Sequence, residues 1–178
     1  MDVSFVPVVP AHWDAVTRFL LAEPWPFHAG APLADAAIDE RINAGGWTGR
    51  AGPGRQNFWI QTGPRRSGLL RIFDLDDGTP LFDLRVSESA RNRGVGTGAV
   101  RWVARYVFDG WPDVTRIEAT TRVDNVAMRR ILEHCGWVKE SHWREAWSSP
   151  DRAYDGVGYA LPRRDHERGS VTPVRWDD

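Results

Sequence analysis

The sequence predicts an α+β domain built around a mixed β-sheet, and three observations carry this prediction. Three strand-like runs follow one another in the first half of the chain, which suggests an antiparallel meander. Helical and strand-like segments alternate in the second half. The chain has 178 residues, enough for a sizeable core but few for two domains. We therefore expect one domain over residues 1–162 and a polar, loosely ordered tail over 163–178.

The first half is expected to hold one strand, two helices and the meander. Residues 3–9 are short and β-branched, and the apolar spacing over 11–23 predicts a helix that "PWPF" stops. "LADAAIDERINAGG", residues 33–46, predicts a second helix that ends at a glycine pair. The meander consists of "QNFWIQTG", "SGLLRIFDL" and "LFDLRV", separated by turn-rich segments.

The second half is expected to alternate helices and strands. A helix beginning near Gly98 carries one apolar stripe, and "VTRIEATT" follows it as a strand. The next helix has the same apolar spacing and ends at Gly136, where a left-handed cap is expected. "WVKESHWREAWS" and "YDGVGYALP" predict a closing pair of strands.

Composition excludes several classes of partner. The formal net charge of -1 gives no bulk electrostatic reason to bind nucleic acid or an anionic membrane. Cys135 is the only cysteine, so neither an intrachain disulfide nor a cysteine-type zinc site is expected, and we predict no metal. The first residues lack a basic leader, and no stretch is apolar enough to span a bilayer. A soluble cytoplasmic protein is therefore expected.

A glycine-rich stretch, "RNRGVGTGA", separates the last strand of the meander from the next helix. Glycines at alternate positions let backbone N–H groups converge on an anion at a helix N-terminus. The stretch is not the dinucleotide fingerprint, which requires glycine where Ala99 stands, and no Gly-Lys-Ser/Thr of a P-loop follows. Taken alone, the glycines fit either a phosphate cradle or a tight turn.

Three segments in register resemble the GCN5-related N-acetyltransferase (GNAT) superfamily. "RNRGVG", residues 91–96, resembles the family's Arg/Gln-x-x-Gly-x-Gly/Ala motif. Residues 117–140 resemble its strand, Asn-bearing turn, helix and following strand, and residues 154–161 resemble the last strand of the RimJ/RimL-like branch of ribosomal-protein N-terminal acetyltransferases. The resemblance implies a GNAT-type, mostly antiparallel central sheet flanked by about four helices. It also implies an N-acyltransferase whose co-substrate is acetyl-CoA or another acyl-CoA.

The resemblance assigns the acyl donor to the last meander strand and the glycine loop. The loop backbone would hold the diphosphate, and the strand would pair with the pantetheine arm as an added strand. Asn125 would contact the arm from the other side, and it also suits the N-cap of the next helix. The predicted donor-binding residues are Leu84, Arg85, Val86, Arg91, Asn92, Arg93, Gly94, Val95, Gly96, Thr97, Gly98, Asn125 and Arg130.

Acyl transfer to an amine needs the amine in its neutral form, so we expect a general base that removes its proton. Asp83, beside the donor strand, is the first candidate for base or amine anchor, and an ion pair with an arginine is its alternative. Glu118 is the second candidate. His134 is a candidate acid for the leaving thiolate, or else a surface histidine. Cys135 falls on the apolar helical stripe, which favours direct attack in a ternary complex over a covalent intermediate.

The acceptor pocket is expected where the resemblance places it, at the loop after the first helix and at the last hairpin. Trp25, Phe27, His28 and also Trp47 would supply aromatic walls, and Asp155 would attract a cation. The acceptor is then a small-molecule amine or a protein N-terminus, and a homodimer stays possible. The family's tyrosine acid is missing, which leaves a non-catalytic module that binds coenzyme A or another anion as the alternative function.

Overall fold

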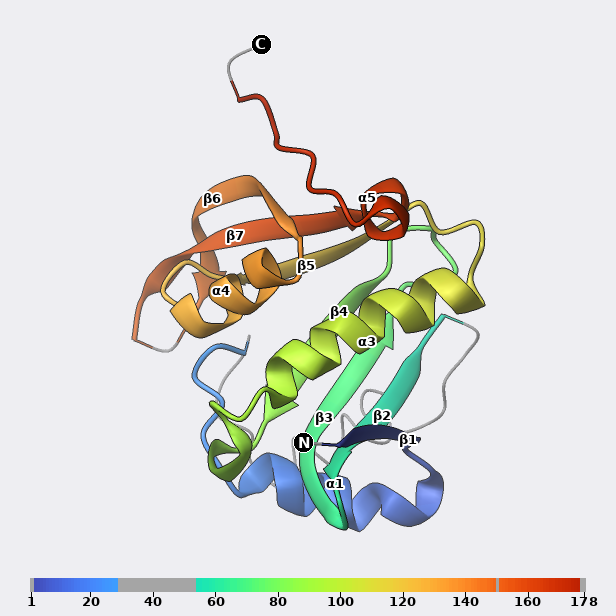
Figure 1. Cartoon of the computed structure of the whole chain (residues 1–178). Coiled ribbons are helices and arrows are strands. Elements are labelled where there is room, and N and C mark those ends of the chain that lie inside the picture. The colour runs from blue at the N-terminus through green and yellow to red at the C-terminus, as the bar shows by residue number, and fades with distance from the viewer. Residues whose placement is uncertain (1, 29–53, 150, 177–178) are drawn as a thin grey trace.

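The computed structural model describes residues 2–28, 54–149 and 151–176, and its centre is a seven-stranded sheet (Figure 1). The second helix expected over 33–46 lies outside the described residues, as does Trp47. The strands are β1 (Val3–Pro7), β2 (Gln56–Thr62), β3 (Arg65–Phe73), β4 (Leu81–Val86), β5 (Arg116–Arg122), β6 (Val138–Ser148) and β7 (Ala153–Pro162). The helices are α1 (Trp13–Leu21), α3 (Val95–Gly110), α4 (Val126–His134) and α5 (Arg163–Arg168), with short 3₁₀ turns at Pro10–His12 and Glu88–Ala90.

The sheet is mixed and mostly antiparallel, as predicted. The strand order is β1-β2-β3-β4-β5-β7-β6, and the first four strands form the expected antiparallel meander. Strand β7 pairs antiparallel with both β5 and β6. The one parallel pair is β4 with β5, and it joins the two halves of the sheet through Leu81 opposite Glu118.

Helices cover both faces of the meander. Neighbouring residues of a strand point to opposite faces, and both faces of β2 carry large apolar side chains that need to be buried. Trp59 of β2 is fully buried with Val16 and Leu20 of α1. The adjacent Phe58 belongs to the larger core beneath α3, together with Leu132 of α4. Helix α3 buries the predicted apolar stripe of Val100, Val103, Ala104 and Val107. No helix among the described residues is long and apolar enough to cross a membrane.

Two expected boundaries differ from the structure. Helix α3 begins at Val95 rather than near Gly98, because Gly94 adopts a left-handed conformation (φ 80°) that turns the chain directly into the helix. The chain after Pro162 forms α5 instead of a loose tail. Its Asp165 is 2% exposed and accepts hydrogen bonds from the Thr172 amide (2.9 Å) and hydroxyl (2.8 Å), which hold the following residues against the helix.

Gly68 is expected to be intolerant of a side chain, because β3 lies very close to β4 at this position. A Cβ here would lie 2.6 Å from the carbonyl oxygen of Arg85. We expect Gly68→Ala to lower the free energy of unfolding by about 1–3 kcal/mol, as overpacking does, measured by urea denaturation. Gly110→Ala is the matched control, since its Cβ would meet no described atom within 4 Å. Equal losses in the two variants would contradict the prediction.

Candidate active site

The candidate site is the opening where β4 and β5 separate. The two strands are paired at Leu81 and Glu118, and the Glu118 amide donates to the carbonyl of Pro80 (2.9 Å). Beyond this point β4 runs on to Val86 without a registered partner in β5. Two cavities, of about 390 and 190 Å³, lie along the opening and share Phe27, His28, Leu84, Asn125 and Met128 in their walls.

The glycine turn forms one end of the larger cavity. Gly94 is the N-cap of α3 and supplies no capping side chain, and the first four N–H groups of an α-helix have no partner within the helix. Gly96 lines the cavity together with Leu84 and Val86 of β4. A Cβ at Gly96 would lie 2.9 Å from the Ile131 side chain of α4, so the missing side chain keeps this end open.

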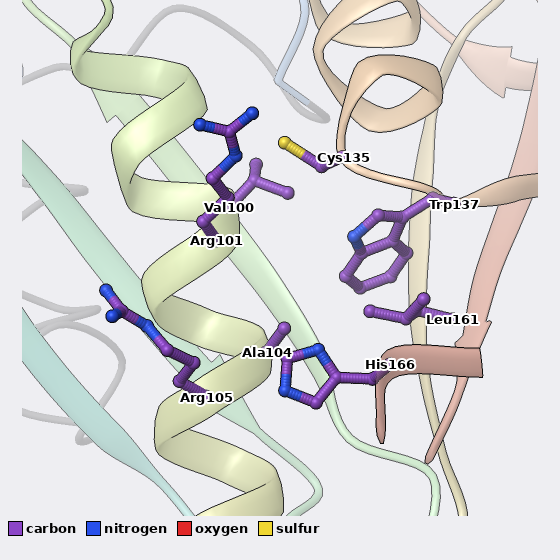
Figure 2. Close-up of a pocket in the computed structure, with 8 residues that line it drawn as sticks. All are labelled: Val100, Arg101, Ala104, Arg105, Cys135, Trp137, Leu161 and His166. Atoms are coloured by element: carbon purple, nitrogen blue, oxygen red, sulfur yellow. The ribbon is translucent and has the colours of Figure 1, made fainter. Parts of the chain in front are cut away.

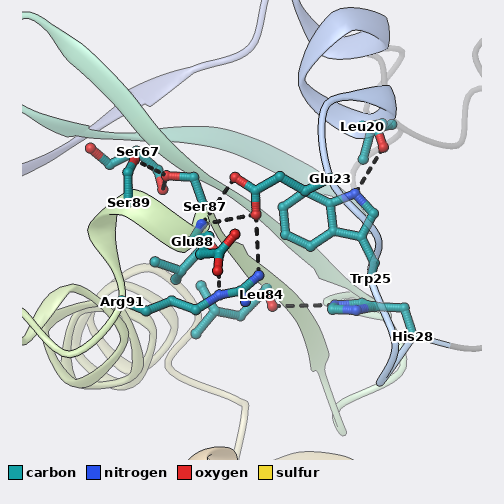
Figure 3. Close-up of polar contacts among 11 residues, drawn as sticks. Leu20, Glu23, Trp25, His28, Ser67, Leu84, Ser87, Glu88, Ser89 and Arg91 are labelled. Atoms are coloured by element: carbon teal, nitrogen blue, oxygen red, sulfur yellow. Dashed lines mark hydrogen bonds and ion pairs between the residues drawn. The ribbon is translucent and has the colours of Figure 1, made fainter.

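Arg91 and Asn92 also line the larger cavity, and a network of polar contacts fixes Arg91 (Figure 3). The Arg91 Nε donates to the Val86 carbonyl (3.0 Å), and its Nη2 lies 3.2 Å from Glu23. Glu23 also accepts the backbone N–H of Glu88 with both carboxylate oxygens (2.8 and 3.0 Å). The chain that leaves α1 is thereby tied to the segment that carries the glycine turn.

Asp83 and His28 meet in the smaller cavity. The His28 Nε2 lies 3.1 Å from Asp83 Oδ1 and 3.3 Å from the Leu84 carbonyl oxygen. Both neighbours are acceptors, so Nε2 carries the proton, and Nδ1 is buried without a hydrogen-bond partner. Burial acts to raise the pKa of Asp83, but the hydrogen bond and charge of His28 and the charges of Arg85 and Arg71 outweigh it and hold that pKa below its ordinary value.

Arg122 pins the segment that carries His28 to the end of β5. Its buried guanidinium holds the Asp124 carboxylate by two bonds (2.9 and 2.6 Å) and donates from Nη1 to the Pro26 carbonyl (2.9 Å). It also stacks 3.5 Å from the Tyr154 ring centroid. Sequence reasoning missed this clamp because the acceptor is a main-chain carbonyl, which leaves no signal in the sequence.

The smaller cavity is largely apolar. Its walls include Phe27, Phe73, Phe82 and Trp147, and the hydroxyl-bearing Thr120 and Thr121 of β5 complete one side. Asp83 is the single carboxylate among the described lining residues. The cavity therefore offers aromatic surface around one negative charge, and that charge is already paired with His28 and with Arg85 (3.4 Å).

Asn125 is the N-cap of α4, which confirms one of its two predicted roles. Its Oδ1 accepts the backbone N–H of Met128 (3.3 Å), and its Nδ2 donates to the Thr121 hydroxyl (2.9 Å). Asn125 also lies in the walls of both cavities, opposite Leu84. The capping bonds fix the side chain, so the amide is held at the opening.

Three predicted site residues are not brought to the opening. Glu118 is paired with Arg116 (2.9 Å), and His134 accepts from Arg101 of α3 (3.2 Å). Asp155 lies against His142 (2.7 Å) in the β6–β7 hairpin, where it also accepts the Glu145 amide (2.9 Å). None of the three lines either cavity. Glu118 pairs along its own strand, whereas His134 and Asp155 contact a neighbouring helix and a neighbouring strand that the sequence alone does not place.

Some of the predicted donor-binding residues also lie away from the two cavities. The Arg85 side chain lines neither cavity, because it is 4% exposed and lies between Asp83 (3.4 Å) and the Trp25 ring (5.4 Å). Arg93 and Arg130 are exposed and line neither cavity. Val95 is buried in the core, whereas Thr97 and Gly98 lie in the first turn of α3.

Cys135 lies outside the opening. Its thiol faces α3, where it is 3.9 Å from the carbonyl oxygen of Thr97. Burial raises the pKa of this thiol, and the charge of Arg101 opposes the shift without cancelling it. Among the described residues, no group of three or more histidine, cysteine, aspartate or glutamate side chains is placed to hold a metal ion.

This combination of a mixed sheet that splits between two parallel strands and a glycine turn at the split defines an acyltransferase of the GNAT class. The chain matches the family model described as "Acetyltransferase (GNAT) domain" over residues 3–138. It therefore belongs to the GNAT acetyltransferase family, whose acyl donor is acetyl-CoA. No curated protein matches the sequence at a significant level.

Solved structures share this fold at low sequence identity. A chimera of spermidine N-acetyltransferase SpeG from Vibrio cholerae and hSSAT superposes with a TM-score of 0.79 at 13% identity, covering 94% of this chain and 99% of the other. Mycobacterium smegmatis RimJ in complex with CoA-disulfide gives a TM-score of 0.75 at 19% identity, covering 92% and 83%. At these identities the likeness establishes the fold.

Removing the Arg122 clamp is expected to loosen the segment that carries His28. We expect Arg122→Gln to lower the free energy of unfolding by about 1–3 kcal/mol, the cost of losing hydrogen bonds to a charged group. Hydrogen exchange at residues 25–28 should rise with it. Arg152→Gln is the matched control, because Arg152 stacks on the same Tyr154 ring (4.4 Å) but is exposed. A loss no larger than that of the control would contradict the role of the clamp.

Proposed function

We propose that this protein transfers an acyl group from an acyl-CoA, acetyl-CoA in the first instance, to a primary amine that attacks the thioester directly. The observation that carries the proposal is the opening between β4 and β5, which has the glycine turn in the wall of one cavity and the Asp83–His28 pair in the wall of the other. Donor and acceptor can therefore meet at the five residues that the two cavities share.

The larger cavity fits the acyl donor. Unpaired N–H groups at the start of α3 suit a diphosphate, and the helix dipole adds to their attraction. From Leu84 to Val86, β4 has no partner strand on the side of β5, and an extended, amide-bearing arm would add to the sheet there as a strand does, next to the contacts that His28 and Arg91 make with the Leu84 and Val86 carbonyls. Arg91 also lines this cavity, with its guanidinium held by Glu23. The RimJ neighbour was solved with CoA-disulfide, which supports a coenzyme A derivative as the ligand.

His28 is the proposed general base. Its Nε2 hydrogen-bonds to the Leu84 carbonyl and lies 3.1 Å from Asp83, so the buried Nδ1 is the remaining acceptor of a side chain that lines both cavities. Asp83 then acts as a positioning residue that fixes the ring and its tautomer. Its lowered pKa keeps it ionised but makes it a weak proton acceptor, which is why we move the role of base from Asp83 to His28.

The proposed reaction needs no proton donor or acceptor besides His28. The amine nitrogen bonds to the acyl carbon while its proton passes to His28 Nδ1, and the carbon–sulfur bond breaks. Main-chain N–H groups of β4 would stabilise the charge that develops on the acyl oxygen. Because His28 lines both cavities, it can return the proton to the departing thiolate. Cys135 takes no part, since it lies outside the opening.

The smaller cavity favours a compact acceptor with one amine on an apolar body. Its described walls include three phenylalanines and a tryptophan, and their single carboxylate is internally paired, which gives little to hold the several charges of a polyamine. A peptide α-amine, with a pKa of roughly 7.7–8.0, costs only about 1 kcal/mol to deprotonate at neutral pH, against about 4–5 for a lysine-like amine. A protein N-terminus or a small apolar amine therefore suits this base best.

The donor site can be tested by placing a negative charge at Gly96. Gly96→Asp should weaken acetyl-CoA binding at least ~100-fold, because a carboxylate about 4 Å from a phosphate is repelled by several kcal/mol in a partly buried site. Calorimetry measures the affinity. Gly63→Asp adds the same charge at the β2–β3 turn, where a Cβ would meet no described atom within 4 Å, and should bind normally. Unchanged affinity in Gly96→Asp would refute the cradle.

The base can be tested by the pH dependence of a His28 variant. His28→Gln should lower kcat/KM at pH 7 by about 10²–10⁴-fold, the usual contribution of a general base. The deficit should shrink as the pH rises past the pKa of the acceptor amine, because solvent then removes the proton. His12→Gln, in the turn before α1, is the control. Asp83→Asn should cost less, since His28 keeps its bond to Leu84. A deficit independent of pH would assign His28 to binding or structure.

Thiol release from acetyl-CoA with a panel of amines and peptides separates this function from its alternative. An enzyme releases coenzyme A with at least one acceptor, and the product carries the acyl group on nitrogen. Tight binding of coenzyme A without turnover on any amine would instead favour a non-catalytic binding module.

A further inference from the structure

A third cavity, of about 300 Å³, lies between α3, the end of α4 and α5 (Figure 2). It shares no lining residue with the two cavities of the opening, although α3 contributes to both regions. Its floor is apolar and buried, formed by Val100, Ala104 and Leu161. Its volume is at the lower limit of small-molecule sites.

A buried donor without a partner is directed into this cavity. Trp137 is 2% exposed, and its indole Nε1 has no hydrogen-bond partner. Figure 2 shows the nitrogen edge of the ring facing α3 across the cavity. The ring is fixed by an edge contact with Phe82 (5.6 Å between centroids). An indole N–H can only donate, so whatever satisfies it must be an acceptor.

The ionisable side chains that line the cavity include no acid. Arg101 and Arg105 stand one turn apart on the same face of α3, and His166 of α5 lies across from them. Arg101 donates to His134 (3.2 Å), which leaves its other N–H groups available. No acidic side chain occurs among the described lining residues.

We propose that this cavity binds a small organic carboxylate with an apolar body. The carboxylate would accept from the Trp137 indole and from the Arg101 guanidinium, a donor of the kind that pairs well with carboxylates, and the charge of Arg105 would attract it at longer range. The body, about the size of one aromatic ring, would rest on the apolar floor. Neither the acyl donor nor the acceptor amine of the proposed reaction is needed for this binding.

The experiment uses the full ¹⁵N-labelled chain and follows the indole N–H signal of Trp137 by NMR. The signal is assigned by its absence in Trp137→Phe, or by through-bond assignment if that variant does not fold. Phenylacetate should shift it with a Kd on the order of 0.1–1 mM. Arg105→Gln, an exposed substitution, should weaken binding about fivefold. Arg66→Gln, on β3 over Trp59, should leave it unchanged.

Four results would overturn the proposal. They are no shift of the Trp137 signal at about 10 mM phenylacetate, an equal response to neutral phenylacetamide, an equal response to inorganic phosphate, and displacement of phenylacetate by coenzyme A. The last would make the cavity part of the donor site. Since the readout is binding, a lack of acetyltransferase activity would not affect the result.

Discussion

The separation of β4 from β5 is the constraint on which the rest of this structure depends. Each half of the sheet is held by its own antiparallel ladders, and the halves meet at Leu81 and Glu118. Past that contact β4 has no partner strand on the side of β5, and two of its carbonyls, those of Leu84 and Val86, are met by the side chains of His28 and Arg91 instead. Buried backbone groups require such partners. A ligand with amide groups of its own is a natural partner, so the split in the sheet is itself the start of a binding site.

Two sets of contacts hold the two halves of the sheet in place on either side of the opening. On one face, α3 and α4 share a core that includes Val103 and Leu132, so the two halves cannot drift apart. On the other side, the segment after α1 is tied to both halves, to the first through Glu23 and the Glu88 amide, and to the second through Pro26 and Arg122. His28 comes directly after these two anchors. Its position is therefore set by both halves of the sheet together.

The sequence predicted the parts of this site that are local in the chain. The run "LFDLRV" was predicted as the last strand of the meander and forms β4, and the glycine motif located the start of α3 to within three residues. The assignment of His28 to the acceptor pocket stays a prediction. Its contact with Asp83 was not predicted, because the two residues are 55 positions apart in the chain and their contact depends on packing between elements. His134 does not reach the opening for the same reason, since Arg101 of α3 holds it, whereas Glu118 pairs with Arg116 two residues earlier on the same strand.

Local charge decides what this protein can bind more than its net charge of -1 does. The acids nearest the opening are already engaged: Asp83 with His28, Asp124 with Arg122, and Glu23 with the Glu88 amide and Arg91. Because these acids are paired, they do not offset the partial positive charge of the N–H groups at the start of α3, beside the larger cavity. An acidic chain can in this way keep an electropositive site for an anionic ligand, because a paired carboxylate repels an anion far less than a free one does.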